Sequence, residues 1–129
     1  MQDFRKIRVW ERSHRLVIRI YKATANFPKE EIYGLTSQLR RASVSIPSNI
    51  AEGSSRDGDA EFCRFLHISI GSASEIDYQL MLAHDLGYLN DQDYKYLSSE
   101  VNIVRQKLIA LIQSIKGETA NKTQVLPTA

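Results

Sequence analysis

The sequence predicts an all-α protein, an antiparallel up-and-down four-helix bundle. Apolar residues recur at the helical spacing of three and four residues in four separate segments, and no stretch shows the strict apolar–polar alternation of a half-buried strand. The connections between the segments are short, so consecutive helices should pack side by side and antiparallel. A chain of 129 residues is one domain that can bury a core without a disulfide or metal.

The first two helices are expected at residues 7–26 and 35–52. The first should stop ahead of Phe27-Pro28, because the residue before a proline disfavours helical geometry. The second contains Pro47, which should bend it, and should end at Gly53, a common C-cap residue. Their expected core faces are Trp10, Val17 and Ile20 on the first, and Leu35, Leu39, Ala42, Ile46 and Ile50 on the second.

The third helix is expected to start near Asp57 or Asp59 and end by Gly87, and the fourth to run from Asn90 or Asp91 to Lys116. Residues 1–116 then form the bundle domain, and residues 117–129 a flexible C-terminal tail without periodicity. The expected core faces are Phe62, Leu66, Ser69, Ala73, Ile76, Leu80 and Ala83 on the third helix, and Tyr94, Leu97, Val101, Val104, Leu108, Leu111 and Ile115 on the fourth.

Composition and motif spacing argue against several functional classes. The single cysteine, Cys63, fits a reducing compartment, and with no signal peptide or long apolar run we expect a cytoplasmic protein. A di-iron bundle needs two Glu-x-x-His units, and this chain has one, Glu11 to His14. No set of nucleophile and base is visible. We therefore expect no enzyme, no metal and no cofactor.

Charge is unevenly distributed along the chain. Residues 1–56 hold eleven Lys and Arg against five Asp and Glu, a net charge of +6, whereas residues 57–129 hold six against ten, a net charge of −4. Six cations of the first segment recur at spacings of three and four residues, a band about 100° wide on one helix. They are Arg5, Arg8, Arg12, Arg15, Arg19 and Lys22, and Arg40 and Arg41 on the second helix are candidate extensions.

Such a row of cations can follow a phosphate backbone, because phosphate binding grows with the number of charges neutralised. Three interpretations stay open: an RNA- or DNA-binding surface, an ordinary solvated helix face, and pairing with acidic residues of a neighbouring subunit. No aromatic residue interleaves the row in sequence, so base stacking is not expected from it.

Several apolar residues lie outside the expected core faces. Apolar side chains at helical spacing on a second face predict a partner surface, and most oligomers are homomeric. A wider core or scattered surface residues are the alternative. The candidate subunit interface consists of Ile7, Ile18, Tyr21, Ile68, Tyr78, Leu82, Tyr96 and Ile103.

The segment GLTSQLRRASVSIPSNIAEG, residues 34–53, resembles the signature of the 23S rRNA intervening-sequence protein family, also called the bacterial four-helix-bundle protein family. Supporting matches are VW at 9–10, IY at 20–21, FP at 27–28 and GSASEIDYQL at 71–80, so the resemblance spans roughly residues 4–115. It implies a cytosolic bacterial bundle that assembles as a homopentamer. A protein of similar fold, the accessory protein of diversity-generating retroelements, binds nucleic acid and a reverse transcriptase.

Residues and resemblance together predict a non-enzymatic, self-assembling bundle that binds RNA or DNA through the basic row on the first helix. The alternative is a scaffold or adaptor whose partner is another protein and which has no nucleic-acid ligand. The sequence does not distinguish the type of nucleic acid or the biological process.

Overall fold

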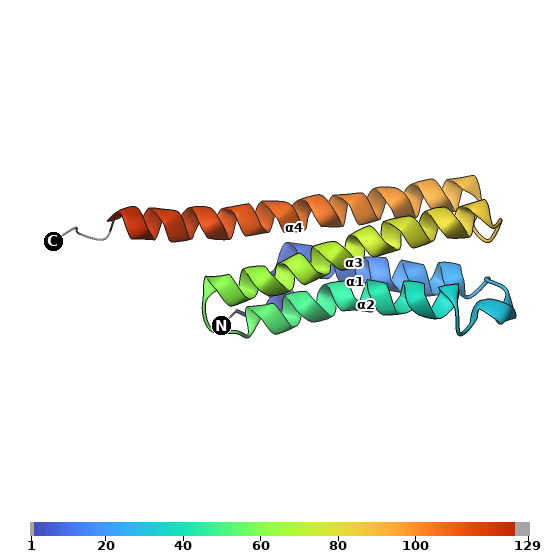
Figure 1. Cartoon of the computed structure of the whole chain (residues 1–129), viewed down its shortest axis with the longest axis horizontal. Coiled ribbons are helices and arrows are strands. Elements are labelled where there is room, and N and C mark those ends of the chain that lie inside the picture. Colours follow the sequence, from blue (N-terminus) through green and yellow to red (C-terminus); the bar gives the residue numbers. More distant parts are fainter. Residues whose placement is uncertain (1, 126–129) are drawn as a thin grey trace.

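The computed structural model describes the backbone of residues 2–125 and the side chains of residues 2–121. Four α-helices form the described part of the chain: α1 (Arg8–Thr24), α2 (Leu35–Ser54), α3 (Asp59–Asp85) and α4 (Asp91–Val125). Two 3-10 turns, η1 (Phe4–Lys6) and η2 (Lys29–Glu31), precede α1 and α2. The described part contains no strand, and successive helices run antiparallel (Figure 1). The predicted four-helix bundle is confirmed.

Each helix packs against two others: α1 against α2 and α4, and α3 against α2 and α4. The core runs along the centre of this ring, and the core faces predicted for α2 and α3 are buried throughout. On α4 the prediction holds except that Ile112, rather than Leu111, is buried, and Tyr94 is only partly buried.

The core face predicted for α1 is wrong by part of a turn. Trp10 and Val17 are only half-buried. The stripe that faces the core contains two hydroxyl residues, which do not contribute to a pattern of apolar positions. Both hydroxyls donate a hydrogen bond to a main-chain carbonyl of the preceding turn. Ser13 donates to Trp10 at 2.8 Å, and Thr24 donates to Ile20 at 2.7 Å. The buried stripe is Val9, Ser13, Leu16, Ile20 and Thr24.

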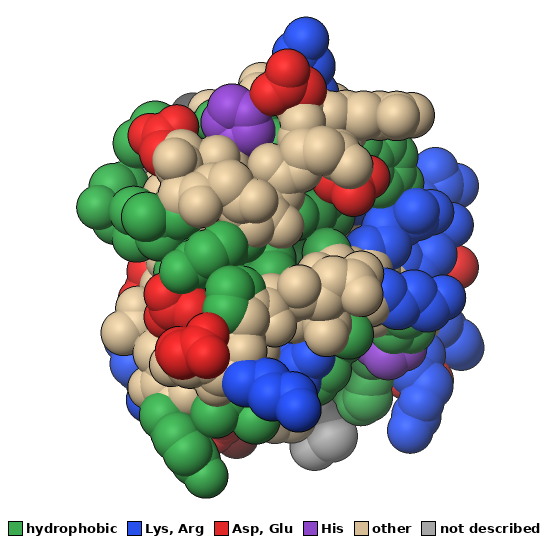
Figure 2. Space-filling model, turned by 90° about the vertical axis from the view of Figure 1, so that its right-hand side faces the viewer, with side chains coloured by type: hydrophobic (Ala, Val, Ile, Leu, Met, Phe, Trp, Pro, Cys, Tyr) green, Lys and Arg blue, Asp and Glu red, His purple; other side chains and the backbone are tan. Residues whose placement is uncertain are grey.

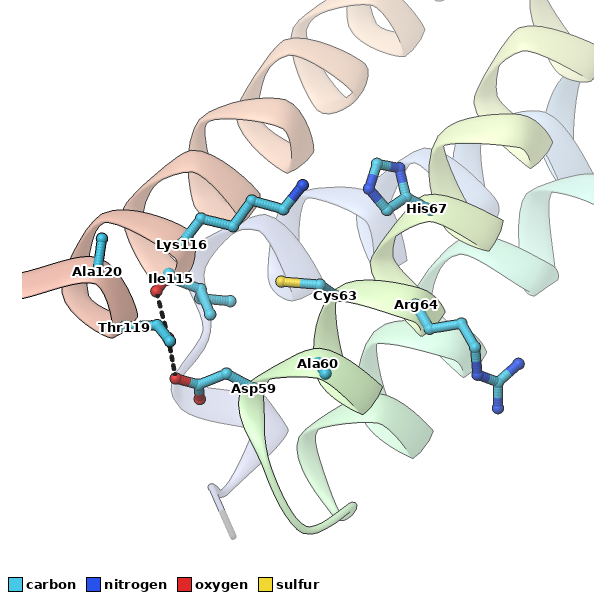
Figure 3. A pocket seen from close by; sticks show the side chains of 9 residues that line it. All are labelled: Asp59, Ala60, Cys63, Arg64, His67, Ile115, Lys116, Thr119 and Ala120. Atoms are coloured by element: carbon cyan, nitrogen blue, oxygen red, sulfur yellow. Dashed lines mark hydrogen bonds between the residues drawn. The ribbon is translucent and has the colours of Figure 1, made fainter. Parts of the chain in front are cut away.

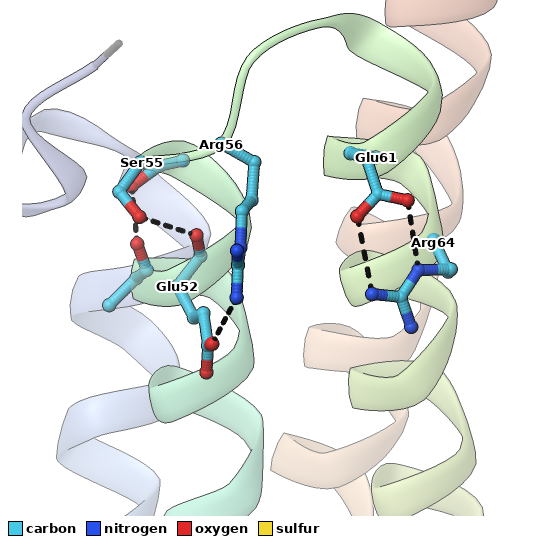
Figure 4. A network of polar contacts seen from close by, with 7 residues as sticks. Glu52, Ser55, Arg56, Glu61 and Arg64 are labelled. Atoms are coloured by element: carbon cyan, nitrogen blue, oxygen red, sulfur yellow. Dashed lines mark hydrogen bonds and ion pairs between the residues drawn. The ribbon is translucent and has the colours of Figure 1, made fainter.

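Gly53 does not end α2, as the sequence predicted, but lies inside the helix against α3. A Cβ atom at this position would stand 2.7 Å from Cβ of Phe65 and 3.0 Å from Cδ1 of Phe62. The missing side chain therefore allows α2 and α3 to approach closely. Beyond this contact, the ion pairs Arg56–Glu52 and Arg64–Glu61 flank the turn between the helices (Figure 4). Both pairs are solvent-exposed and contribute little stability.

Pro47 is accommodated inside α2, which is helical from Leu35 to Ser54. Proline lacks an N–H group and removes one backbone hydrogen bond. Nearby polar side chains make local bonds: Asn49 donates to the carbonyl of Ser45 at 2.8 Å, and the Ser43 hydroxyl donates to the carbonyl of Arg40 at 2.9 Å.

α4 is longer than predicted, because it continues from Lys116 through Gly117 to Val125 and projects past the start of α3 (Figure 1). Residues 117–125 of the predicted flexible tail are therefore helical. The remainder, residues 126–129, lies outside the described residues, and the flexibility of residues 117–129 stays a prediction. In the described part, none of the helices combines the length and the apolar character needed to cross a membrane.

Candidate nucleic-acid interface

The surface of α1 divides into three stripes that follow from its helical period. Arg8, Arg12, Arg15, Arg19 and Lys22 lie roughly 120° around the helix axis from the buried stripe. This side of α1 faces α4, because Arg12 and Arg19 both contact α4 side chains. We call these five residues the basic row. Trp10, His14 and Tyr21 lie on the other side, which faces α2.

Most of the basic row is free to meet a ligand. Arg8, Arg15, Arg19 and Lys22 are exposed. Lys and Arg side chains gather on the side of the molecule where α1 lies (Figure 2). Four exposed cations within about four helical turns create the concentrated positive potential that attracts a polyanion.

Arg12 differs from the other members of the basic row. Its guanidinium forms a two-pronged contact with Glu100 of α4, with Nε donating to Oε2 at 3.3 Å and Nη2 to Oε1 at 3.4 Å. The two side chains are 34% and 20% exposed. A partly desolvated pair of this geometry holds α1 against α4 and neutralises one cation of the row.

A groove runs between α1 and α4 along the part of the basic row from Arg12 to Lys22, and Arg8 lies beyond its end. Two adjoining cavities, of about 300 Å³ and about 130 Å³, lie in it and share Arg19 and Tyr96 as walls. Four cations and two carboxylates line them, a net charge of +2. The lining residues are Arg12, Arg15, Leu16, Arg19, Lys22, Ala23, Asn26, Asp93, Tyr96, Leu97 and Glu100. We call this the α1–α4 groove.

Tyr96 brings an aromatic ring into this basic surface. The Arg19 guanidinium carbon lies 4.8 Å from the centroid of the Tyr96 ring, and Tyr96 remains 41% exposed. No aromatic residue interleaves the basic row on α1, and the ring beside it comes from α4. The ring comes from a residue far along the chain, so inspection of the helix-one sequence could not have found it. The sequence pattern places Tyr96 in the candidate subunit interface, and that assignment stays a prediction.

The other predicted cations lie away from the groove. Arg5, in η1, pairs with Asp3 at 3.5 Å and lies over the Phe4 ring. Arg40 contacts the opposite side of α1, donating to Thr24 Oγ1 at 2.9 Å and to a main-chain carbonyl at the end of the helix. There it offsets the negative end of the α1 dipole. Arg41 is exposed on α2.

Lys107 is a cation that the sequence analysis did not assign. It is exposed and lies two turns beyond Glu100 on the same face of α4. Lys107 lies beyond the α1–α4 groove, to which α4 contributes the carboxylates Asp93 and Glu100. Helical spacing on α4, counted from Tyr96, is the signal that could have identified it.

The candidate subunit-interface residues divide into two groups. Ile7 and Leu82 pack against the core, and Ile103 is half-buried. The others leave between 41% and 58% of their surface exposed: Ile18, Tyr21, Ile68, Tyr78 and Tyr96. Exposed apolar residues absent from the prediction include Tyr33 at 95% and Ile32 at 56%.

A larger cavity of about 640 Å³ lies between the start of α3 and the end of α4 (Figure 3). Cys63 points into it, with Lys116 alongside, whereas Arg64 points away. Burial raises the pKa of the Cys63 thiol, which keeps it protonated and unreactive near neutral pH. Within the described residues, no three His, Cys, Asp or Glu side chains gather in a way that could hold a metal ion.

Fold and site together define a four-helix-bundle protein with a basic groove on one side. The family model described as "23S rRNA-intervening sequence protein" matches residues 5–110. The chain belongs to the 23S rRNA-intervening sequence protein family. It is similar to a solved protein of unknown function from the S23 ribosomal protein family of Bacteroides thetaiotaomicron, with 26% identity and a TM-score of 0.73. The match covers 81% of this chain and 97% of the other. No curated protein matches the chain.

Proposed function

We propose that this protein is a non-enzymatic, self-assembling bundle of the cytoplasm that binds RNA or DNA through the α1–α4 groove. The observation that carries the proposal is the alignment of exposed Arg8, Arg15, Arg19 and Lys22 along one side of α1. Among the described side chains, the basic row has one ion pair, between Arg12 and Glu100.

The energetic basis of the proposal is the release of counterions from phosphate. Each phosphate that meets a fixed cation releases condensed counterions, so affinity falls steeply as salt increases. Arg and Lys on a rigid helix hold their spacing before the ligand arrives, which reduces the ordering cost of binding.

The test is a charge reversal with a control of equal net charge. In the groove variant, Arg8→Glu, Arg15→Glu and Lys22→Glu are combined. This choice spares Arg12 and Arg19, whose contacts with α4 support the fold. The control combines Lys29→Glu, Lys95→Glu and Lys116→Glu, three exposed lysines outside the basic row. Both variants change the net charge from +2 by six units, to −4.

Binding of labelled RNA and DNA is measured by fluorescence anisotropy at low salt. The groove variant should lose binding by at least about tenfold, since three charge contacts are each replaced by repulsion. The control should retain most of the wild-type affinity. An equal loss of affinity in both variants would mean that net charge alone explains the effect. Unchanged binding in the groove variant would refute the proposed interface.

Self-assembly, expected as a pentamer, is the second part of the proposal. Exposed apolar residues on α1, α3 and α4 supply surface that another copy can bury. Light scattering at micromolar concentration should give five times the chain mass of 14.7 kDa. A monomeric mass at that concentration would refute self-assembly. If instead a defined protein partner covers these residues and no nucleic acid binds, the molecule is a scaffold.

A further inference from the structure

We infer that the α1–α4 groove takes single-stranded rather than duplex nucleic acid, with an unpaired base stacked against the Arg19–Tyr96 pair. This inference rests on the proposed function and adds the class of ligand. It follows from the different chemistry of the two walls of the groove and from the exposed ring between its two cavities.

The α1 wall is suited to phosphate. Arg15, Arg19 and Lys22 succeed one another along it, separated by about 6 Å and about 4.5 Å of helix rise. All three are exposed and line the groove. An extended strand lying along α1 can therefore place successive phosphates beside successive cations.

The α4 wall is suited to bases. It presents Tyr96 and the carboxylate of Asp93, while the second carboxylate, Glu100, is paired with Arg12. A carboxylate repels phosphate, but it accepts hydrogen bonds from the N–H groups of bases. A strand bound in the groove is thus oriented, with its backbone on the α1 side and its bases turned toward α4.

Tyr96 supplies a stacking platform at the point where the two cavities meet. Its ring borders both cavities, and the Arg19 guanidinium lies over the face of the ring as a second planar group. Bases stack well on aromatic rings and on guanidinium planes. A duplex covers the faces of its bases and offers only their edges in the grooves. Only an unpaired base can use this platform.

The experiment compares three labelled probes: an oligouridylate and an oligothymidylate of about 12 nucleotides, and a DNA duplex of the same length. Wild-type protein should prefer the single strands. Tyr96→Ala should weaken single-strand binding by about 5- to 150-fold, the effect of losing one stacked base, and leave duplex binding unchanged. Tyr96→Phe keeps the ring and should retain the wild-type preference.

A spectroscopic measurement supports the same conclusion without relying on affinity. With Trp10→Phe removing the only native tryptophan, Tyr96→Trp places a fluorophore on the platform. Stacking of a base should quench its emission on addition of oligouridylate but not of duplex. Light scattering must show that Tyr96→Ala keeps the wild-type mass, because a lost assembly would assign Tyr96 to a subunit contact and overturn the inference.

Failure of this inference is distinguishable from failure of the proposed function. If single strands and duplex bind equally and Tyr96→Ala changes neither, while reversal of the basic row abolishes both, the stacking platform is refuted and the basic groove stands. If the wild-type protein binds no probe in a salt-sensitive manner, both proposals fall.

Discussion

Replacing glycine with alanine should have opposite effects on stability at two positions, because only one of them lies where α2 closely approaches α3. Gly53 lies inside α2, where an added Cβ would stand 2.7 Å from Cβ of Phe65. Gly71 lies inside α3, exposed, with no heavy atom within 4 Å of an added Cβ. Gly71→Ala is therefore the control for Gly53→Ala.

Two effects of known size compete at Gly53. Alanine in a helix interior is favoured over glycine by about 0.8–1 kcal/mol. Overpacking a tight contact destabilises by about 1–3 kcal/mol. The contact at Gly53 is with the base of the Phe65 side chain, which is fixed to the α3 backbone and cannot move aside alone. We expect the overpacking to dominate, for a net destabilisation of up to about 2 kcal/mol.

At Gly71 only the helix-propensity gain operates, so Gly71→Ala should stabilise the protein by about 0.5–1 kcal/mol. Urea unfolding followed by the helical circular dichroism signal measures both variants. All samples need one protein concentration, because assembly makes apparent stability concentration-dependent. A Gly53→Ala variant as stable as Gly71→Ala would refute the close helix contact.

Three further predictions concern individual side chains. Glu100→Gln should reduce stability by about 0.2–1 kcal/mol, because its ion pair with Arg12 is lost. The same substitution should tighten nucleic-acid binding in the anisotropy assay, because the groove loses a carboxylate. Unchanged or weaker binding would contradict the view that positive charge in the groove drives binding. The hydrogen bond from His84 to Asp91 raises the pKa of His84. The folded state thus holds this proton more tightly, and the stabilisation is full below about pH 6.5 and lost as pH rises through the folded-state pKa. Urea unfolding between about pH 6 and pH 8 should show this loss in wild type and less of it in His84→Gln, whereas parallel curves would rule out the contribution. Cys63, 7% exposed and with its pKa raised by burial, should react slowly with a thiol reagent until the protein unfolds, and rapid labelling of native protein would contradict its burial.

The elements that the sequence predicted well are those with strong apolar periodicity. The core faces of α2 and α3 followed from repeating Leu, Ile and Ala residues, and both were assigned correctly. The α1 stripe was missed because Ser13 and Thr24 occupy core positions, and hydroxyls that bond to their own helix can be buried without an apolar signal. Helix ends were less predictable, since glycine serves two opposite purposes. The sequence predicts a helix cap at Gly53, but this glycine allows close packing. Gly87 has a positive φ of 82° and does follow the end of α3.

The candidate site was predictable only in part for a similar reason. Residues on one helix, such as Arg15 and Arg19, can be placed on a common face from their spacing alone. Contacts between α1 and α4 depend on how the two helices are aligned along the bundle. The pairing of Arg12 with Glu100 and of Arg19 with Tyr96 joins residues more than seventy positions apart. Neither contact could be read from local pattern.

The salt dependence of binding tests the basic groove most directly. Four exposed cations, Arg8, Arg15, Arg19 and Lys22, should give a slope of log affinity against log salt near about −2.8 for a single strand, at about 0.7 for each phosphate neutralised. The variant with Arg8, Arg15 and Lys22 reversed should have a slope near zero, and the lysine control should keep the wild-type slope. A wild-type slope near zero, or the same slope in all three proteins, would contradict binding through this groove.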